Sequence, residues 1–73
     1  MKQKSTNLQI QFGKKIRELR LKKNWSQEEL GFETDLDRTY ISGIERGERN
    51  PSLKNIGKLS KALNVSLSKL FAF

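Results

Sequence analysis

Apolar residues recur with the spacing of an α-helix in successive short segments of this 73-residue chain, and turn-forming residues separate the segments. No segment shows the strict alternation of apolar and polar residues that is typical of a half-buried strand. The sequence therefore predicts an all-α fold, a single compact domain over residues 1–73 with five short helices around one core. The first helix is expected over about residues 6–23, with an apolar stripe made of Leu8, Phe12, Ile16 and Leu19.

The start of the second helix is marked by a capping signal. Ser26 precedes Glu29 by three residues, which is the spacing of a capping box, so the helix is expected to begin directly after Ser26. It is expected to end near Thr34 or Asp35, because Asp tolerates the left-handed conformation that a tight turn requires. Asp37 can then cap a third helix that ends before Gly47, and its inward residues are Ile41 and Ile44.

Two more helices are expected in the last third of the chain. Asn50 as the N-cap and Pro51 as the first helical residue predict the start of the fourth helix, and Asn64 is its expected stop. Ser66 can cap a fifth, shorter helix. The apolar residues expected on these two helices are Leu53, Ile56, Leu59 and Leu63, followed by Leu67, Leu70 and Phe71.

The charge balance favours a polyanionic partner. Fifteen Lys and Arg against eight Asp and Glu give a formal net charge of +7, so nucleic acid is the first candidate. The outer segments 1–17 and 49–73 each carry +5, whereas residues 18–48 carry −3. For most of the lysines taken singly, a solvated surface is the simpler interpretation.

Composition excludes most catalytic and membrane functions. The chain has no Cys and no His, so disulfides, zinc fingers and imidazole catalysis are excluded. We therefore expect a protein that is not an enzyme and needs no metal, cofactor or small-molecule ligand. The longest apolar run, residues 70–73, is far shorter than the roughly 18 residues of a membrane span, which predicts a soluble, cytoplasmic protein without a membrane partner.

Residues 27–46 have the pattern of a helix-turn-helix, two short helices around a turn of three to four residues. A helix that lies in the major groove of DNA needs a narrow waist and side chains that donate hydrogen bonds. Gly43 fits this need, although close helix packing explains it equally well, and Tyr40 lies at the edge of the outward face. That face consists of Arg38, Thr39, Ser42 and Arg46.

The strings 27–30, 36–47 and 49–53 resemble the Cro/C1-type (Xre) helix-turn-helix family, and within it the controller proteins of restriction-modification systems. The resemblance implies a lambda-repressor-like fold and a homodimer that binds operator half-sites in double-stranded DNA. It also implies a regulator of its own gene and the endonuclease gene, an activator at low occupancy and a repressor at high occupancy, with RNA polymerase as a further candidate partner. Asp35 and Gly31 depart from the usual Gly and Ala of the motif, and we expect them to loosen the turn slightly.

Candidate DNA contacts follow from the motif. Arg38 and Thr39 start the recognition helix and are expected to contact bases, against the alternative of an exposed Arg and a Thr that helps the cap. Ser42 on the same helix is a further candidate for base contact, and the resemblance favours Arg49 as a second base reader. For three candidates a structural role is an equally open alternative to DNA contact: Tyr40 can pack on its neighbours, and Asn50 and Ser52 can cap a helix. The candidates for backbone or base contact are Gln27, Tyr40, Arg46, Asn50 and Ser52.

Other residues are assigned to structure or assembly. Glu45 should not face a polyanion, and the resemblance pairs it with Arg20 in a structural ion pair, while Trp25 is assigned to the core. Residues 53–73 are the expected dimerisation region, with the alternative that their side chains complete the core of the monomer. Residues 1–6 are expected to fray. The candidate interface residues are Val65, Leu67, Leu70 and Phe71.

Two other functions remain open at this level. A phage-type repressor or an antitoxin of the same fold would share every residue argument given above. A protein-binding module would instead use the apolar C-terminal helix to hold a partner, and the basic surface would be incidental. Salt dependence discriminates between them, because a protein that neutralises several phosphates binds more weakly as salt rises.

Overall fold

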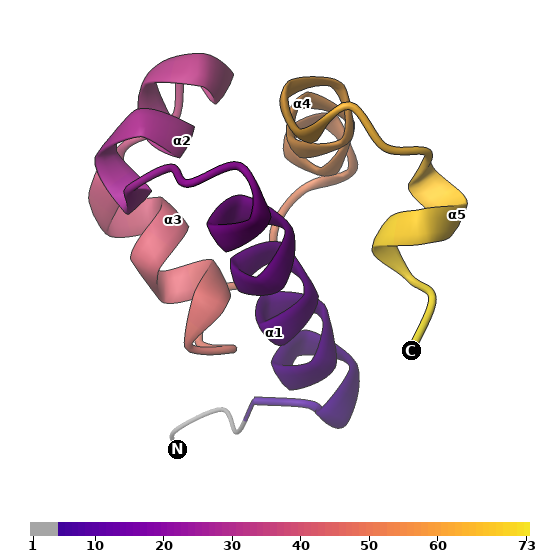
Figure 1. Cartoon of the computed structure of the whole chain (residues 1–73). Coiled ribbons are helices and arrows are strands. Elements are labelled where there is room, and N and C mark those ends of the chain that lie inside the picture. The colour runs from indigo at the N-terminus through magenta and orange to yellow at the C-terminus, as the bar shows by residue number, and fades with distance from the viewer. Residues whose placement is uncertain (1–4) are drawn as a thin grey trace.

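The computed structural model describes residues 5–73, and in that range the chain forms five helices and no strand (Figure 1). This architecture confirms the predicted all-α fold of five short helices. The expected fraying falls mainly on residues 1–4, which lie outside the described range, whereas Thr6 caps the first helix. The helices are α1 (Asn7–Lys22), α2 (Gln27–Thr34), α3 (Arg38–Glu45), α4 (Leu53–Leu63) and α5 (Leu67–Leu70).

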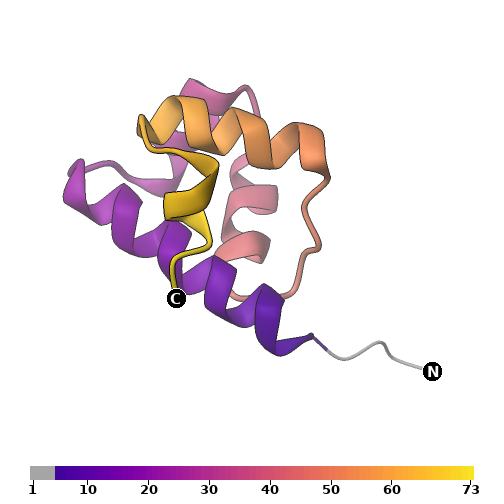
Figure 2. The same cartoon turned by 90° about the vertical axis from the view of Figure 1, so that its right-hand side faces the viewer.

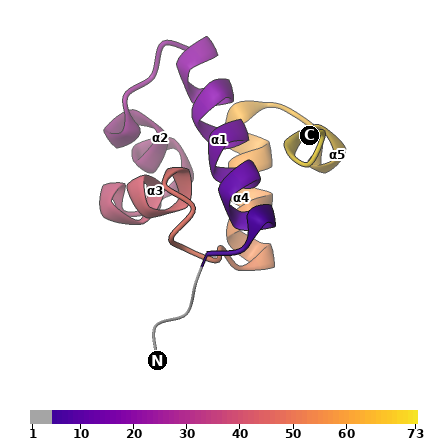
Figure 3. The same ribbon diagram turned by 90° about the horizontal axis from the view of Figure 1, so that it is seen from below.

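The first helix is the centre of the arrangement. Figures 1 and 3 show α2 and α3 on one side of α1 and α5 on the other, and Figure 2 shows α4 running across the molecule above α1. All five helices contribute to one core, which leaves much of α2 and α3 exposed on the side away from α5. The core residues are Phe12, Ile16, Leu19, Leu30, Ile41, Ile44, Leu59, Leu63 and Leu70.

Two residues of the apolar stripes predicted for the first and fourth helices are exposed instead of buried in this core. Leu8 is 58% exposed and Leu53 is 80% exposed. Each lies in the first turn of its helix, α1 or α4. The helical period therefore predicts which face of a helix is apolar, but not which residues along that face are covered.

Helix starts follow the predicted capping chemistry with one correction. Ser26 and Glu29 form the expected capping box, and the Asp37 side chain accepts a hydrogen bond of 2.8 Å from the Thr39 backbone N–H. The prediction that Asn50 caps α4 and that Pro51 is its first residue is wrong. Ser52 is the cap, because its hydroxyl accepts from the Asn55 backbone N–H at 3.1 Å. The fixed φ of a proline also suits the extended chain before a cap.

Helix ends use the left-handed conformation. Asp35 follows α2 with a φ of 58°, as predicted. Asn64, the predicted stop of α4, also has a left-handed φ, of 57°. Gly47 has a φ of 75° after α3. Within residues 5–73, no helix is long and apolar enough to cross a lipid bilayer.

Candidate nucleic-acid interface

The turn between α2 and α3 is tight. Three residues, 35–37, connect the helices, and the Leu36 backbone N–H donates to the Gly31 carbonyl at 2.9 Å. A Cβ added to Gly31 would lie only 2.7 Å from the Leu36 carbonyl oxygen. The expectation that Gly31 loosens the turn is therefore wrong, because the missing side chain is what lets the turn close against α2.

The third helix presents the outward face that the sequence predicts. Ile41 and Ile44 are buried, while Arg38 and Thr39 at the start of α3 are exposed. Within residues 5–73, Arg38 forms no ion pair. Its guanidinium is therefore available to a base edge or a phosphate.

A buried ion pair fixes the end of α3 against α1 and α2. Arg20 donates to both carboxylate oxygens of Glu45, from Nε to Oε2 at 2.7 Å and from Nη2 to Oε1 at 2.9 Å. Arg20 Nη1 also donates to the Trp25 carbonyl at 2.7 Å. The hydrogen bonds that Arg20 donates to the Glu45 carboxylate raise the pKa of Arg20 above its ordinary value. Glu45 is thus turned into the molecule, which removes a negative charge from the outward face of α3.

Gln27 lies at the same junction. Its Nε2 donates to Glu45 Oε1 at 3.1 Å, and the residue is half-buried. Gln27 is also the first residue of α2, and backbone N–H groups at a helix N-terminus attract anions. The side-chain amide nevertheless already has a partner within the protein, so the structural use of Gln27 accompanies the predicted DNA contact.

Two of the residues predicted to contact DNA form a hydrogen bond with each other. Arg46 Nη1 donates to the Ser42 hydroxyl, and Arg46 Nε pairs with Glu48 at 3.1 Å. Arg46 is exposed and Ser42 is partly exposed. Their side chains therefore lie on the outward surface but would have to exchange local hydrogen bonds for contacts to DNA.

The loop after α3 returns over that helix. Arg49 is exposed, and its guanidinium carbon lies 5.8 Å from the centre of the Tyr40 ring. Asn55 on α4 donates from Nδ2 to the Tyr40 hydroxyl at 3.1 Å. Asn50 and Ser52 are exposed in the same connection. No local sequence pattern indicates the role of Asn55, because its partner is fifteen residues away and on another helix.

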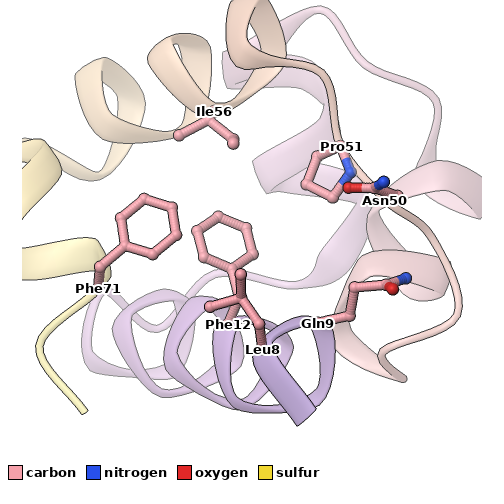
Figure 4. Close-up of a pocket in the computed structure, with 7 residues that line it drawn as sticks. All are labelled: Leu8, Gln9, Phe12, Asn50, Pro51, Ile56 and Phe71. Atoms are coloured by element: carbon pink, nitrogen blue, oxygen red, sulfur yellow. The ribbon is translucent and has the colours of Figure 1, made fainter. Parts of the chain in front are cut away.

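The candidate dimer residues divide into two groups. Leu70 has no exposed surface, so the prediction that it contacts a partner is wrong and it belongs to the monomer core. Val65 is half-buried, whereas Leu67 is 50% and Phe71 is 40% exposed. The Phe71 ring also stacks on Phe12 at 5.0 Å, beside a shallow apolar hollow (Figure 4).

Comparison with known proteins identifies the family. The helix-turn-helix family model matches residues 16–70. The control protein C.BamHI of Bacillus amyloliquefaciens is 57% identical over 70 residues, which cover 94% of this chain and 86% of the relative. The restriction-modification controller protein C.AhdI from Aeromonas hydrophila is 51% identical, with a TM-score of 0.84 over 86% of this chain and 96% of that chain. The chain belongs to the helix-turn-helix family of restriction-modification controller proteins.

A second solved controller adds a DNA complex. The controller protein C.Esp1396I, as a tetramer in complex with its natural 35 base-pair operator, is 41% identical to this chain. The match covers 90% of this chain and 87% of that chain, with a TM-score of 0.82. Membership of the controller family confirms the family inferred from the sequence and places the chain among transcription regulators rather than enzymes.

Proposed function

We propose that this protein is the controller of a restriction-modification system. It binds operator DNA as a homodimer and regulates transcription of its own gene and of the endonuclease gene. The observation that supports this most directly is that C.Esp1396I, a controller of the same fold, is bound to its operator. Such a regulator works in the compartment that holds the DNA, which in bacteria is the cytoplasm. RNA polymerase stays a predicted partner.

Arg38 and Thr39 carry the proposed base recognition at the start of α3. Recognition helices of this type contact base edges mainly from their N-terminal residues. Arg38 is exposed and can present two parallel N–H donors to a guanine, and the adjacent Thr39 offers a hydroxyl and a methyl group. Ser42 on α3 and Arg49 in the loop beyond it are the further proposed base contacts. The proposed contacts to the DNA backbone or to bases, which position the protein on the duplex, are Gln27, Tyr40, Arg46, Asn50 and Ser52.

The proposed dimer uses the exposed part of the C-terminal surface. Leu67 and Phe71 remain exposed in the monomer, and Phe73 is 54% exposed. The Phe71 and Phe73 rings lie 6.3 Å apart, so these two rings form a continuous apolar patch. A two-fold axis through this patch would present two recognition helices to successive half-sites, which lie roughly 34 Å apart in such dimers.

A gel-shift titration tests the proposed function. The probe is DNA from immediately upstream of the gene for this protein, the competitor is a scrambled duplex, and the titration is run at two salt concentrations. We expect preferential binding in dimer steps, with a log–log salt slope of about −0.9 for each phosphate neutralised. Equal binding to both duplexes would overturn sequence-specific regulation.

Two variants assign the base contact. Arg38→Ala should lower the preference for the operator by about 1–3 kcal/mol at the affected base pair. Lys61→Ala removes one exposed positive charge from α4 and should leave the preference unchanged. If Arg38→Ala weakened binding to both duplexes equally, Arg38 would be a phosphate contact and not a base reader.

A further inference from the structure

The side chain of Arg49 lies on α3, over the one residue of that helix that has no side chain. A Cβ added to Gly43 would be 2.5 Å from Arg49 Cγ, 3.3 Å from Nε and 3.4 Å from Cδ. The Arg49 backbone N–H donates to the Gly43 carbonyl at 3.2 Å, and the Glu48 N–H donates to the same carbonyl at 2.9 Å. Gly43 therefore leaves a notch in α3 that the stem of Arg49 fills.

The Tyr40 ring bounds the same notch. Residues three apart on a helix lie on one face, so Tyr40 and Gly43 are neighbours. The guanidinium carbon of Arg49 is 5.8 Å from the centre of the Tyr40 ring, which is within the range of a cation–π contact. A guanidinium held over a ring keeps the N–H donors at its edge available for a base or a phosphate.

The ring itself is held from another helix. Asn55 in the first turn of α4 donates from Nδ2 to the Tyr40 hydroxyl at 3.1 Å, and both residues are half-buried. The backbone N–H of Asn55 is bound by the capping hydroxyl of Ser52 at 3.1 Å. The position of the ring thus depends on the start of α4 as well as on α3.

We propose that Tyr40 and Gly43 form a cradle that orders Arg49 before DNA arrives, and that Asn55 is the positioning residue that fixes the cradle. This rests on the proposed function of Arg49 as a DNA contact. A side chain that is already ordered loses less freedom when it binds, and the gain for one long side chain is on the order of 2- to 10-fold in affinity. Asn55 and Gly43 thereby affect the sequence preference at the base pair that Arg49 contacts, although neither residue contacts that base pair itself.

A double-mutant cycle separates this role from direct contact with DNA. Gly43→Ala, Arg49→Ala and the double variant are titrated with the operator and with operators changed at single base pairs. Gly43→Ala should weaken operator binding by roughly 2- to 10-fold. It should also reduce the sequence preference at the same base pair at which Arg49→Ala reduces it. In the Arg49→Ala background, Gly43→Ala should have no further effect. Additive losses would overturn the cradle, because Gly43 would then act by its own approach to DNA.

Asn55→Ala provides a second arm that leaves α3 unchanged. It should reproduce the loss in the wild-type background and be silent in the Arg49→Ala background. In the DNA-free protein, ¹⁵N relaxation of the Arg49 Nε–H should show increased motion in both Asn55→Ala and Gly43→Ala. Unchanged relaxation in both variants would overturn pre-ordering, even if DNA binding were weakened.

The outcomes also separate this inference from the function on which it rests. If the wild-type protein shows no preference for the operator, the proposed function fails. If the wild-type protein prefers the operator and Arg49→Ala weakens it, but neither Gly43→Ala nor Asn55→Ala couples to Arg49, only the cradle fails. Circular dichroism of each variant checks that the helices are intact.

Discussion

Arg20 and Glu45 are charged residues within a small core, with side chains only 8% and 4% exposed. Removing two charges from water is costly, and their attraction compensates only if the geometry is good and the remaining polar atoms are satisfied. Here the pair is bidentate, and further hydrogen bonds reach the Trp25 carbonyl and the Gln27 amide. Among the described residues, every buried side-chain nitrogen and oxygen has a partner. The pair therefore specifies how α1, α2 and α3 meet.

Breaking this pair on one side should be strongly destabilising. Arg20→Ala or Glu45→Ala leaves a buried charge without a partner, so each should lower the free energy of unfolding by about 3 kcal/mol or more. Urea denaturation measures the change. Lys22→Ala is the matched control, because Lys22 and Glu18 form an exposed pair at 3.5 Å, and its effect should stay below about 0.5 kcal/mol.

Two further observations bear on this prediction. The double variant Arg20→Met, Glu45→Leu should lose less stability than the two single losses added together, because no charge is left buried alone. Since the pKa of Arg20 is raised, the contribution of its charge is complete below the pKa of an unfolded Arg and is lost only in strong alkali. Similar losses for Lys22→Ala and Arg20→Ala would contradict the structural role.

At the scale of helices, the two glycines Gly31 and Gly57 are placed in opposite environments. Both lie inside helices, α2 and α4, where Gly costs about 1 kcal/mol relative to Ala. The Leu36 carbonyl would be 2.7 Å from a Cβ at Gly31, whereas nothing lies within 4 Å of a Cβ at Gly57. Helix propensity alone therefore predicts the same effect of an added methyl group at the two positions, whereas packing predicts different effects.

The same substitution should consequently have opposite signs at the two positions. Gly57→Ala should raise the free energy of unfolding by about 0.5–1 kcal/mol, because the helix gains propensity without a clash. Gly31→Ala should lower it by about 1–2 kcal/mol, because backbone must move to admit the methyl group. Thermal and urea unfolding of the two variants decide this. Stabilisation by both substitutions would show that the turn after α2 can relax.

How much the sequence predicts depends on the range of the interaction concerned. Ser26 and Asp37 were identified as caps because a cap and its partner lie within three residues. At the start of α4, the local pattern favours Asn50 as the cap and Pro51 as the first helical residue, whereas the cap is Ser52. The contact of Asn55 with Tyr40 and the fit of Arg49 on Gly43 depend on how α3, the following loop and α4 meet in space. Such contacts have no local signature.

Burial was predicted by face more reliably than by position along the helix. Ile41 and Ile44 are buried as their spacing implied. Leu53 shares the stripe of α4 but is exposed, and Leu70 was assigned to an interface but is fully covered by its own chain. The period of a helix specifies a direction, while the lengths and ends of its neighbours decide which residues on that side are covered.

For the whole molecule, two of the exposed apolar side chains lie on different sides of α1. Leu67 lies on α5 and is 50% exposed, and Phe32 lies on α2 and is 84% exposed. Figure 1 shows these two helices on opposite sides of α1. The dimer proposed above uses only the face of α5, so the two residues serve as test and control.

Leu67→Gln should weaken the dimer, whereas Phe32→Gln should not. A buried Leu contributes about 1.5–3 kcal/mol, and a two-fold interface contains it twice, so the dimer Kd should rise by at least about 10-fold. Sedimentation velocity over a concentration series measures the Kd directly. A larger effect of Phe32→Gln would place the interface on α2.

Most of the cap side chains described above carry no titratable group. Four of the five helices in residues 5–73 begin on the hydroxyl groups of Thr6, Ser26, Ser52 and Ser66, which do not titrate. The chain has no His, the side chain whose ordinary pKa falls near neutrality. The Kd for the operator should therefore change less than about twofold between pH 6 and 7, yet rise steeply from 50 to 200 mM salt. Operator binding by a controller of this kind would respond to the ionic strength of its surroundings and to the concentration of the protein. A change in cellular pH within this range would have little effect on it.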